Sequence, residues 1–543
     1  MRDRSIFKAE IRYRKGEIIL QDSRTPAVSM RNITKTFGTI TANKNVDLDI
    51  YRGEILSLLG ENGSGKTTLM NMLSGIYFPD EGEIFIDGEP VVISSPKVAS
   101  DLGIGMIHQH FKLVNVFTAA QNIILGIDQD SEDGKKIKGF SKLDVEKASK
   151  KIREICDLYG FDVDPDQKVY DMSVSQKQTV EIVKVLYKGA DILILDEPTA
   201  VLTPQETEKL FAVLRNMRED GKTVVIITHK LHEVEAISDK VAILRKGEYI
   251  GTLITKETNA QEMTNMMVGR EVKLNIDRPE PHDVKPRIKV KGLTVRSEDG
   301  LLKLDDVSFT ANTGEVLGIA GISGCGQKEL LEAIAGLQPI EKGEIIYVED
   351  DGTETNLTEL SDLEIDAKGV SLAFVPEDRL GMGLVASMDL VDNMMLRSFR
   401  RKGKIAGFTD RKTPRDLAEK VVEELEVVTP SLETPVRRLS GGNVQKVLVG
   451  REIAMNPTVL MSAYAVRGLD INASYIIYDL VNQQKERGVA VIFVGEDLDV
   501  LLELSDRILV LCGGKVSGIV DGRTADKNGV GLLMTKLGGE AVG

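Results

Sequence analysis

The chain has 543 residues, of which 42% are hydrophobic, 28% charged and 5% aromatic, and its formal net charge is −15. Because single hydrophobic cores rarely grow beyond roughly 250–300 residues, this length predicts two or more domains. Its 69 lysines and arginines are spread along the chain and outnumbered by 84 acidic residues. That distribution argues against nucleic acid as the main partner, since phosphate contacts need a concentrated basic surface.

No apolar run approaches the roughly 20 residues that span a bilayer. The N-terminus, residues 1–14, is charged and lacks the apolar stretch of a secretory signal. The three cysteines, Cys156, Cys325 and Cys512, have neither metal-ligand spacing nor an even count. We therefore expect reduced structural thiols in a cytosolic protein that does not itself cross a membrane.

From residue 26 onwards, short apolar strands alternate with amphipathic helical stretches such as Gln205–Glu219. Continuous apolar strands flanked by helices indicate an α/β fold with a mainly parallel sheet covered on both faces. Residues 1–25 match no later part of the chain and form an N-terminal extension to which the sequence assigns no role.

A glycine-rich segment follows the first of the buried strands and opens a helix. Residues 60–67 read GENGSGKT and fit the pattern G-x-x-x-x-G-K-[ST]. The glycines let backbone N–H groups wrap around phosphate oxygens, and the helix N-terminus adds its dipole. Lys66 would reach the outer phosphates, and the Thr67 hydroxyl would hold Mg²⁺. The predicted ATP-binding residues here are Gly60, Glu61, Asn62, Gly63, Ser64, Gly65, Lys66, Thr67 and Thr68.

A later apolar strand, Ile192–Asp196, ends in two neighbouring carboxylates. Asp196 can hold the Mg²⁺ shell through water, and Glu197 is placed to polarise an attacking water. Taken alone, an apolar run followed by Asp-Glu is more often a plain strand end. Together with the phosphate loop it predicts a site that hydrolyses ATP.

With these motifs in this order, the chain resembles the ATPase subunits of ABC transporters. The resemblance implies that Gln109 is the Q-loop residue that senses Mg²⁺ and the membrane subunits, and that His229 contacts the terminal phosphate. It also implies that Phe37 stacks on adenine, with simple core packing as the alternative. The implied catalytic residues are Glu197, His229 and Gln109, and the implied metal ligands are Thr67, Gln109 and Asp196.

The chain then repeats itself. Residues 292–330 follow the same order of strand, Gly-Glu turn, apolar strand and glycine-rich loop as residues 32–69. Three later landmark pairs are each separated by 267 residues: Ser173 and Ser440, Asp196 and Ala463, His229 and Glu496. Constant spacing predicts one fold used twice, in domains at residues 26–275 and 288–543, joined by a proline-bearing linker at residues 276–287. By the resemblance, each is a P-loop ABC ATPase domain with a parallel sheet core, an antiparallel β part and a helical subdomain.

The second repeat has lost the chemistry that the first retains. Gln327 stands at the position of the phosphate-binding lysine, and Lys328 at that of the Mg²⁺-binding hydroxyl. Ala463 and Tyr464 stand at the positions of the two carboxylates. Glu377 stands at the position of the Q-loop glutamine, and Glu496 at that of the histidine. Lys328 brings a cation to a cation site, while Ala463 and Tyr464 leave no carboxylate to hold a metal or polarise water. No aromatic residue lies in the stretch 292–304. Each change removes a group that ATP hydrolysis requires.

The signature motifs show the opposite bias. In ABC proteins the phosphate loop of one domain faces the LSGGQ signature of the other. The second repeat keeps Ser440, Gly441 and Gly442 of that signature and Asp470 of the D-loop, whereas the first reads MSVS at residues 172–175. Side chains in place of the glycines obstruct close approach of backbone amides to phosphate. The sequence therefore predicts one complete composite site, formed by the first phosphate loop and the second signature.

Tandem fusion with a second phosphate loop that ends in Gly-Gln resembles the ATPases of monosaccharide-type importers, over roughly residues 26–540. His108-Gln109-His110-Phe111 and the neutral pair Ala463-Tyr464 resemble the nucleoside branch, although Ala465 stands where that branch has a proline. The resemblance implies an ATP-binding subunit that uses ATP and Mg²⁺ to drive uptake of a nucleoside or related sugar-type solute. It implies two membrane-spanning permease subunits and an external solute-binding lipoprotein as partners. The chain would then lie at the cytoplasmic face of the inner (plasma) membrane, held peripherally through the permeases.

Three other classes fit less well. A soluble tandem ABC ATPase acting on the ribosome would keep both sites complete and carry a long charged helical linker. A DNA-repair ABC protein would need inserted zinc-binding cysteine pairs. A non-hydrolysing interaction module would have retained Lys66, Asp196, Glu197 and His229 by accident.

Overall fold

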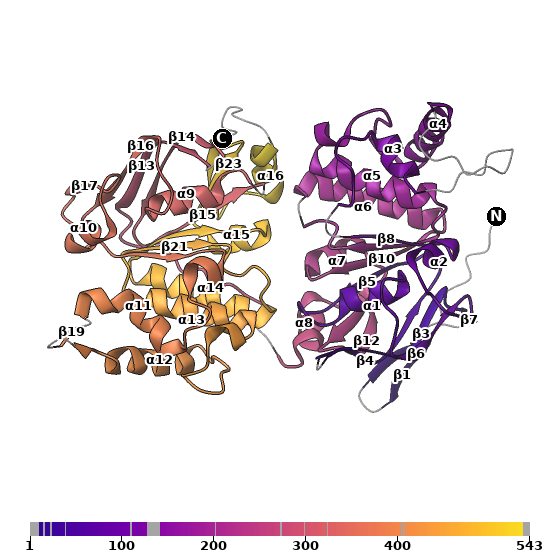
Figure 1. Cartoon of the computed structure of the whole chain (residues 1–543), viewed down its shortest axis with the longest axis horizontal. Helices are drawn as coiled ribbons and strands as arrows, with labels where there is room; N and C mark the ends of the chain where they lie inside the picture. Colours follow the sequence, from indigo (N-terminus) through magenta and orange to yellow (C-terminus); the bar gives the residue numbers. More distant parts are fainter. Residues whose placement is uncertain are drawn as a thin grey trace. The chain divides into compact units, whose positions relative to one another are not determined.

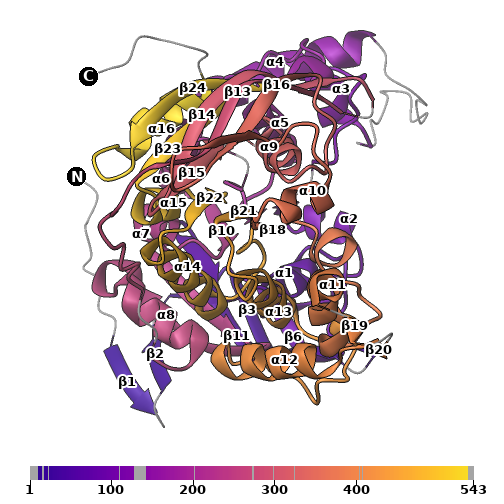
Figure 2. The ribbon, with the colours of Figure 1, turned by 90° about the vertical axis from the view of Figure 1, so that its left-hand side faces the viewer.

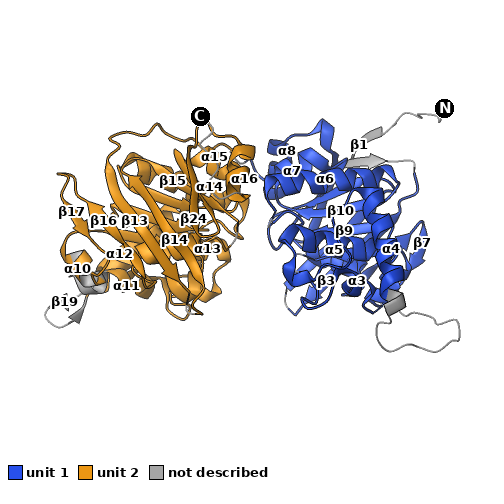
Figure 3. Cartoon of the chain, turned by 90° about the horizontal axis from the view of Figure 1, so that it is seen from above, with its two compact units in different colours: residues 1–273 blue, residues 274–543 orange. Residues whose placement is uncertain are grey.

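The fold is described from a computed structural model, over residues 10–14, 17–21, 24–38, 40–108, 111–126, 142–200, 202–271, 274–297, 299–322, 324–402, 404–405 and 408–535. The chain divides into two compact units, unit 1 at residues 1–273 and unit 2 at residues 274–543 (Figure 1, Figure 3). Among the described residues, no helix is both long and apolar enough to cross a bilayer.

Unit 1 is built around a six-stranded sheet in which only the edge strand β12 runs antiparallel to its neighbour. The strands, in order across the sheet, are β12 (Glu248–Ile254), β11 (Lys240–Arg245), β5 (Ile55–Leu59), β10 (Thr223–Thr228), β9 (Ile192–Asp196) and β8 (Ile104–Ile107). Every residue of β5, β9 and β10 is buried. Alternate residues of β10 enter different cores, Val225 and Ile227 on one face and Val224 and Ile226 on the other. The predicted sheet covered on both faces is confirmed.

An antiparallel sheet, helices and an N-terminal hairpin complete the described part of unit 1. An antiparallel sheet consists of β4 (Ile40–Ile50), β3 (Val28–Phe37), β6 (Glu81–Ile86) and β7 (Glu89–Val91), and shares a core with α1 and one face of the central sheet. The helices are α1 (Lys66–Leu73), α2 (Pro96–Asp101), α3 (Ala119–Ile124), α4 (Lys142–Tyr159), α5 (Val174–Tyr187), α6 (Pro204–Glu219), α7 (Leu231–Ile237) and α8 (Ala260–Val268). Helices α3, α4 and α5 pack around a core of their own and form the helical subdomain (Figure 1). The N-terminal extension contributes an antiparallel hairpin, β1 (Glu10–Arg14) and β2 (Glu17–Gln21).

Unit 2 repeats this architecture strand for strand. Its central sheet consists, in order, of β24 (Lys515–Asp521), β23 (Arg507–Cys512), β15 (Val316–Gly321), β22 (Ala490–Val494), β21 (Val459–Ala463) and β18 (Leu372–Val375). Its antiparallel sheet consists of β14 (Leu302–Asn312), β13 (Pro286–Arg296), β16 (Lys342–Val348) and β17 (Glu354–Asn356). A separate short hairpin consists of β19 (Lys404–Ile405) and β20 (Phe408–Thr409). The helices are α9 (Gln327–Ile334), α10 (Asp362–Ala367), α11 (Leu390–Lys402), α12 (Lys412–Glu424), α13 (Gly441–Ile453), α14 (Ile471–Glu486), α15 (Leu498–Leu504) and α16 (Lys527–Thr535). One α/β fold used twice is therefore confirmed.

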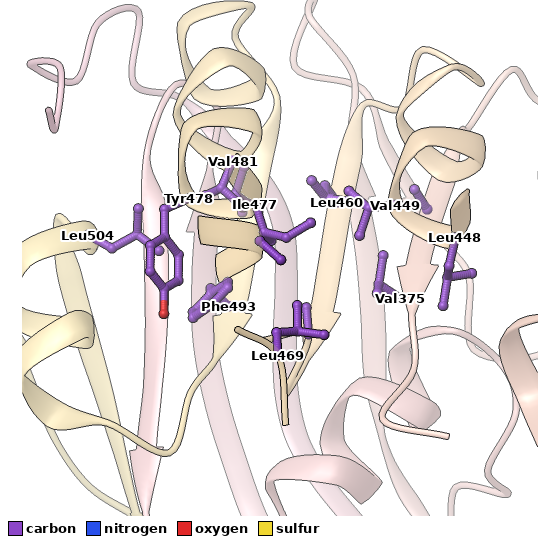
Figure 4. Close-up of a cluster of buried hydrophobic side chains, with 14 of the residues drawn as sticks. Val375, Leu448, Val449, Leu460, Leu469, Ile477, Tyr478, Val481, Phe493 and Leu504 are labelled. Atoms are coloured by element: carbon purple, nitrogen blue, oxygen red, sulfur yellow. The ribbon is translucent and has the colours of Figure 1, made fainter. Parts of the chain in front are cut away.

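Helices α13 and α14 lie side by side along one face of the unit 2 sheet (Figure 1, Figure 2). Ile477, Tyr478 and Val481 of α14 point towards Leu460 and Phe493 of the strands beneath (Figure 4). The opposite face packs with α9 and the antiparallel sheet in a second core. Helix α13, which begins at Gly441 of the predicted signature, is thus fixed to the unit 2 sheet.

Backbone torsions that disfavour ordinary residues recur in both units. Glu197 and Tyr464 each follow the Walker B strand, which is β9, ending in Asp196, in unit 1 and β21, ending in Ala463, in unit 2; their φ angles are 47° and 51°. The glycines that open α1 and α9, Gly65 and Gly326, have φ of 94° and 98°. A non-glycine residue at positive φ costs free energy, so its recurrence at equivalent positions indicates that the surrounding fold imposes it. Unit 2 therefore has the turn geometry of unit 1 at these positions with different side chains.

The segment between the repeats packs with unit 2. Ile276 is buried in its core, and Arg278 donates hydrogen bonds to the carbonyls of Leu502 and Ser505. Lys485, wholly buried, pairs with Asp506 at 2.8 Å and also donates to the carbonyl of Pro279. These charged donors hold residues 276–279 against α14 and α15.

One buried side chain distinguishes the two signature helices. In α5, Gln178 Nε2 donates to the carbonyl of Pro198 at 2.5 Å. In α13, the equivalent Gln445 is fully buried, and neither of its amide atoms has a hydrogen-bond partner within the described parts of the chain. Burying an amide without partners destabilises the folded state.

We expect Gln445→Met to raise the free energy of unfolding by about 1–2 kcal/mol, because it removes an unpartnered amide while keeping the volume of the side chain. Gln178→Met is the matched control and should lower stability by about 1–2 kcal/mol, because it leaves the Pro198 carbonyl without its donor. Denaturant unfolding of the two variants measures both effects. Equal destabilisation by both changes would contradict the assignment.

Candidate functional site

The phosphate loop of unit 1 connects β5 to α1 and fits tightly against its surroundings. A Cβ built at Gly60 would lie 2.3 Å from the carbonyl oxygen of Leu244, and one at Gly65 would lie 2.3 Å from that of Ala42. Neither position therefore admits a side chain. The buried Asn43 supports the loop from β4, since its Nδ2 donates to the carbonyl of Gly65 at 3.3 Å. Contacts with β4 and β11 therefore hold the loop in shape without a ligand.

Lys66, the first residue of α1, points back into this loop. Its Nζ donates to the carbonyls of Gly60 at 2.6 Å and Glu61 at 2.9 Å, and the residue is only 6% exposed. Burial lowers the pKa of Lys66 to about 8, and the charges of Glu197, Asp196 and Glu61 oppose that shift. The ammonium is thus destabilised, and its hydrogen-bond acceptors among the described residues are carbonyls, which suits it to a phosphate.

The remaining loop residues differ in exposure. Ser64 is buried, whereas Asn62, Gly63 and Thr67 are exposed and Thr68 is partly exposed on α1. Asn62 and Gly63 form the open side of the loop, where a phosphate can approach its backbone.

Two oxygens beside the loop can hold a hard cation. Thr67 Oγ1 donates to Asp196 Oδ1 at 3.4 Å, so a hydroxyl from α1 meets a carboxylate from the end of β9. Hydroxyl and carboxylate oxygens are ligands that Mg²⁺ prefers. Burial, with the neighbouring charge of Glu197, raises the pKa of Asp196. A cation bound at this point would compensate that cost.

Glu197 and His229 form a polar pair next to these oxygens. Glu197 Oε1 lies 2.9 Å from His229 Nδ1, and the Glu197 backbone N–H donates to the carbonyl of Ile227 at 2.9 Å. The hydrogen bond from His229 lowers the pKa of Glu197 and outweighs the effect of burial. A carboxylate kept ionised can accept a proton from an attacking water.

These side chains come from the carboxyl ends of three neighbouring parallel strands. Lys66 and Thr67 follow β5, Asp196 and Glu197 follow β9, and His229 follows β10. Ligand sites in open parallel sheets lie at this edge. The structure therefore brings together five of the residues that the sequence predicted. Gln109, predicted in the same site, lies outside the described residues.

Phe37 ends β3 with a half-exposed ring. Tyr77 meets it edge-on, with ring centroids 5.2 Å apart, and Lys35 Nζ lies 5.4 Å from its centroid. Phe37 is 42% exposed, which disfavours simple core packing. An exposed aromatic ring at this place can stack on a base.

Sequence reasoning missed several residues that support the site. Asn43 lies within β4 and Tyr77 lies shortly after α1, and neither position differs in its sequence pattern from an ordinary strand or loop residue. Glu233 is buried beneath the Glu197 turn, where it accepts hydrogen bonds from Thr199 and Thr228. An acidic residue in the first turn of a helix gives no sign that it is buried.

Unit 2 keeps the frame of this site with other side chains. Gln327 is buried and donates from Nε2 to the carbonyl of Ile322 at 3.1 Å, much as Lys66 does within its own loop. Lys328 lies 3.7 Å from Glu332 on the same helix. Burial and the charges of Glu496 and Glu377 raise the pKa of Tyr464.

The signature of unit 2 is open where that of unit 1 carries side chains. Ser440 caps α13 by accepting from the backbone N–H of Asn443 at 3.4 Å, and Asp470 caps α14 by accepting from that of Ala473 at 2.7 Å. Gly441 is exposed, so the first turn of α13 presents backbone amides without a side chain. In unit 1, Val174 occupies the corresponding position and is 38% exposed.

The ABC transporter family matches residues 43–200 and 304–462, which contain the phosphate loop and the strand ending in Asp196, and their counterparts in unit 2. The chain belongs to the ABC transporter family. It is an ATP-binding ATPase subunit of that family, with two ABC domains in one chain.

Several relatives are similar over nearly the whole of this chain and of their own. A nucleoside import ATP-binding protein of Lactococcus lactis is 40% identical over 93% of this chain and 97% of its own. A guanosine import ATP-binding protein of Bacillus subtilis is 40% identical over the same shares. A glucose import ATP-binding protein of Haloferax volcanii is 40% identical over 96% of this chain and 97% of its own.

One solved structure resembles most of the chain. It is a chain of the complex of archaeal ribosomal stalk protein and archaeal ribosome recycling factor, 15% identical, with a TM-score of 0.54 over 88% of this chain and 87% of that one. At that identity the likeness shows a shared tandem fold alone.

The lowered pKa of Lys66 gives a pH dependence with a definite sign. Lys66 must be protonated to pair with phosphate, so ATP affinity, measured without divalent cations, should fall up to tenfold per pH unit above about 8. Binding at that pH should take up a proton, which calorimetry in buffers of different ionisation enthalpy detects. Lys66→Arg stays charged and should bind with an affinity that does not change between pH 7 and 9. A pH dependence that persists in Lys66→Arg would assign it to another group.

Proposed function

We propose that the chain hydrolyses ATP at one composite site, formed by the unit 1 phosphate loop and the unit 2 signature. The unit 1 half comprises Phe37, residues 60–68, Gln109, Asp196, Glu197 and His229. The unit 2 half comprises Ser440, Gly441, Gly442 and Asp470. The observation that carries the proposal is the separation of losses between the units. The unit with Lys66, Glu197 and His229 has side chains in its signature, and the unit with the bare signature lacks all three.

The chemistry follows from the residues of unit 1. Lys66 binds the outer phosphates, and its burial makes an anionic partner favourable. Glu197, ionised and oriented by His229, accepts a proton from the water that attacks the terminal phosphate. His229 also holds that phosphate in place. Thr67, Asp196 and Gln109 are proposed to hold Mg²⁺, which neutralises charge on the phosphates.

Backbone amides at the start of α13 and the Ser440 hydroxyl would contact the other side of the same phosphates. Hydrolysis then splits the bridging ATP into ADP and phosphate, and their departure releases the unit 2 signature from the unit 1 loop. Such ligand-dependent closure is a common way to convert ATP turnover into movement of attached subunits.

We further propose that the attached subunits form an importer for a nucleoside or a related sugar-type solute. The relatives that cover nearly the whole chain are named for import of nucleoside, guanosine and glucose. The partners would be two membrane-spanning permeases and an external solute-binding lipoprotein. The chain would bind peripherally at the cytoplasmic face of the inner membrane. The ribosome-acting alternative has only the fold likeness at 15% identity in its favour, and no feature of the site supports it.

Glu197→Gln is expected to leave ATP binding intact and to lower turnover by about 10³-fold or more, because the amide cannot accept a proton from water. Phosphate release and nucleotide affinity, measured on the same preparation, separate the two effects. The counterpart change in unit 2, Gln327→Lys, should leave turnover at the wild-type value, since the Tyr464 position still carries no base. Turnover that survives in Glu197→Gln would overturn the assignment of Glu197.

The importer proposal predicts that the chain co-purifies with a pair of permeases when all are expressed together. In vesicles, turnover should then rise severalfold when the binding lipoprotein is added with its solute. Parallel assays with guanosine, adenosine, ribose and glucose distinguish the nucleoside from the sugar reading. Equal turnover with and without permeases and lipoprotein would contradict a transport role.

A further inference from the structure

Unit 2 contains a charged bridge at the edge where unit 1 has its catalytic residues. Arg467 pairs through Nη1 with Glu377 Oε1, and its Nε lies 3.0 Å from Glu496 Oε1. Glu377 follows β18, Arg467 lies in the loop after β21, and Glu496 follows β22, which are three neighbouring strands of the sheet. We call these three residues the Arg467 bridge. It joins three loops that the sheet alone leaves separate.

The bridge occupies the positions of residues that act on nucleotide in unit 1. Glu496 corresponds to His229 and Arg467 to Ala200 by the offset of 267 residues, and Glu377 corresponds to Gln109 because each lies two residues after its strand, β18 or β8. Two neutral or basic residues and an alanine have thus become two acids with an arginine between them. Tyr464, at the position of Glu197, lies close enough to feel the charges of all three. Arg467 thus offsets one of the two negative charges while it pairs with both carboxylates.

The bridge continues to the signature. Arg379 Nη2 donates to the backbone carbonyl of Arg467, which ties the turn at residues 379–383 to the loop after β21. A Cβ built at Gly441 would lie 3.2 Å from Arg379 Nη1. A Cβ at Gly442 would lie 3.4 Å from Asp470 Oδ2 in the D-loop that follows Arg467. Both signature glycines are therefore packed against groups that the bridge positions.

Unit 1 has neither part of this arrangement. Ala200 and Phe111 stand at the positions of Arg467 and Arg379, and Val174 and Ser175 stand at those of the glycines. The two arginines occur in the unit whose signature is bare, where Gly441 and Gly442 offer no side chain to fix the first turn of the helix. This pairing within one unit indicates that the arginines serve the signature.

We propose that Arg467 is a positioning residue for ATP turnover: through Glu377, Glu496 and Arg379 it holds the D-loop and the first turn of α13 in the arrangement that contacts ATP bound to unit 1. The inference rests on the proposed composite site. It assigns the degenerate half of unit 2 a role as a rigid support for the signature. Arg467 acts at a distance from the reacting atoms and is not itself a catalytic residue.

The test uses the full chain and compares Arg467→Ala, Arg467→Lys and Arg296→Ala. Arg296 forms a half-exposed ion pair with Glu341 on the antiparallel sheet of unit 2 and serves as the matched control. Arg467→Ala should lower kcat about tenfold and leave the affinity for ATP within about twofold, because Lys66 and the phosphate loop belong to unit 1. Arg467→Lys should recover part of that loss, since an ammonium can pair with one carboxylate but lacks the planar fork that spans two. Arg296→Ala should behave as the wild type.

Hydrogen exchange provides a readout that does not depend on turnover. In Arg467→Ala, the amides of Asn443 and Val444, which donate to Ser440, should exchange about tenfold faster, and those of α14 should be unchanged. A general loss of stability would instead accelerate exchange throughout unit 2. If the alanine variant does not fold, Arg467→Lys and the double change Glu377→Gln with Glu496→Gln carry the same comparison.

The outcomes separate the two proposals. Wild-type turnover and exchange in Arg467→Ala, with Glu197→Gln inactive, would overturn the positioning role and leave the composite site standing. Loss of ATP affinity in parallel with kcat would also overturn it, because Arg467 would then act on nucleotide binding. Wild-type turnover that Glu197→Gln does not reduce would overturn both proposals.

Discussion

The parallel sheet of unit 1 is the constraint on which its site depends. Because β5, β10 and β9 are adjacent and run in the same direction, their carboxyl ends meet at one edge. Residues far apart in sequence then lie within hydrogen-bond distance, as Thr67 does from Asp196 and Glu197 from His229. The buried strands fix these distances, since β10 pairs residue by residue with both β5 and β9. The same burial lowers the pKa of Lys66 and raises that of Asp196, so a phosphate and a cation would each relieve a cost built into the fold.

The duplicated unit separates the fold from its chemistry. Sheet order, the left-handed turn after the Walker B strand and the glycine before the phosphate-loop helix are the same in both units. The charged side chains on this frame are different. In unit 1 a lysine and two carboxylates lie at this edge, and in unit 2 Arg467 pairs with two acids of the same unit. A conserved backbone frame can therefore support either a reacting site or a static one.

Local strain follows the same division. Glu197 takes a positive φ at a position where its side chain meets His229, so the strained turn places a carboxylate beside an imidazole. Tyr464 takes nearly the same torsion without a carboxylate to place. Gln445 likewise stays buried after the proline opposite it has become Ala465, with no amide partner among the described residues. Unit 2 thus has the backbone of unit 1 at these positions without the side chains that the backbone holds in unit 1.

The sequence by itself predicted the fold class, the two repeats and the identity of the phosphate loop. Those features depend on local patterns: apolar strand length, glycines at fixed spacing, and a constant offset between repeats. The tertiary structure alone decided which side chains meet. Phe37 could be core or binding surface until its exposed fraction was known, and Asn43 and Glu233 gave no local sign of their support for the site. Arg467 reads as an ordinary loop arginine, because its partners Glu377 and Glu496 come from strands that only the folded sheet makes neighbours.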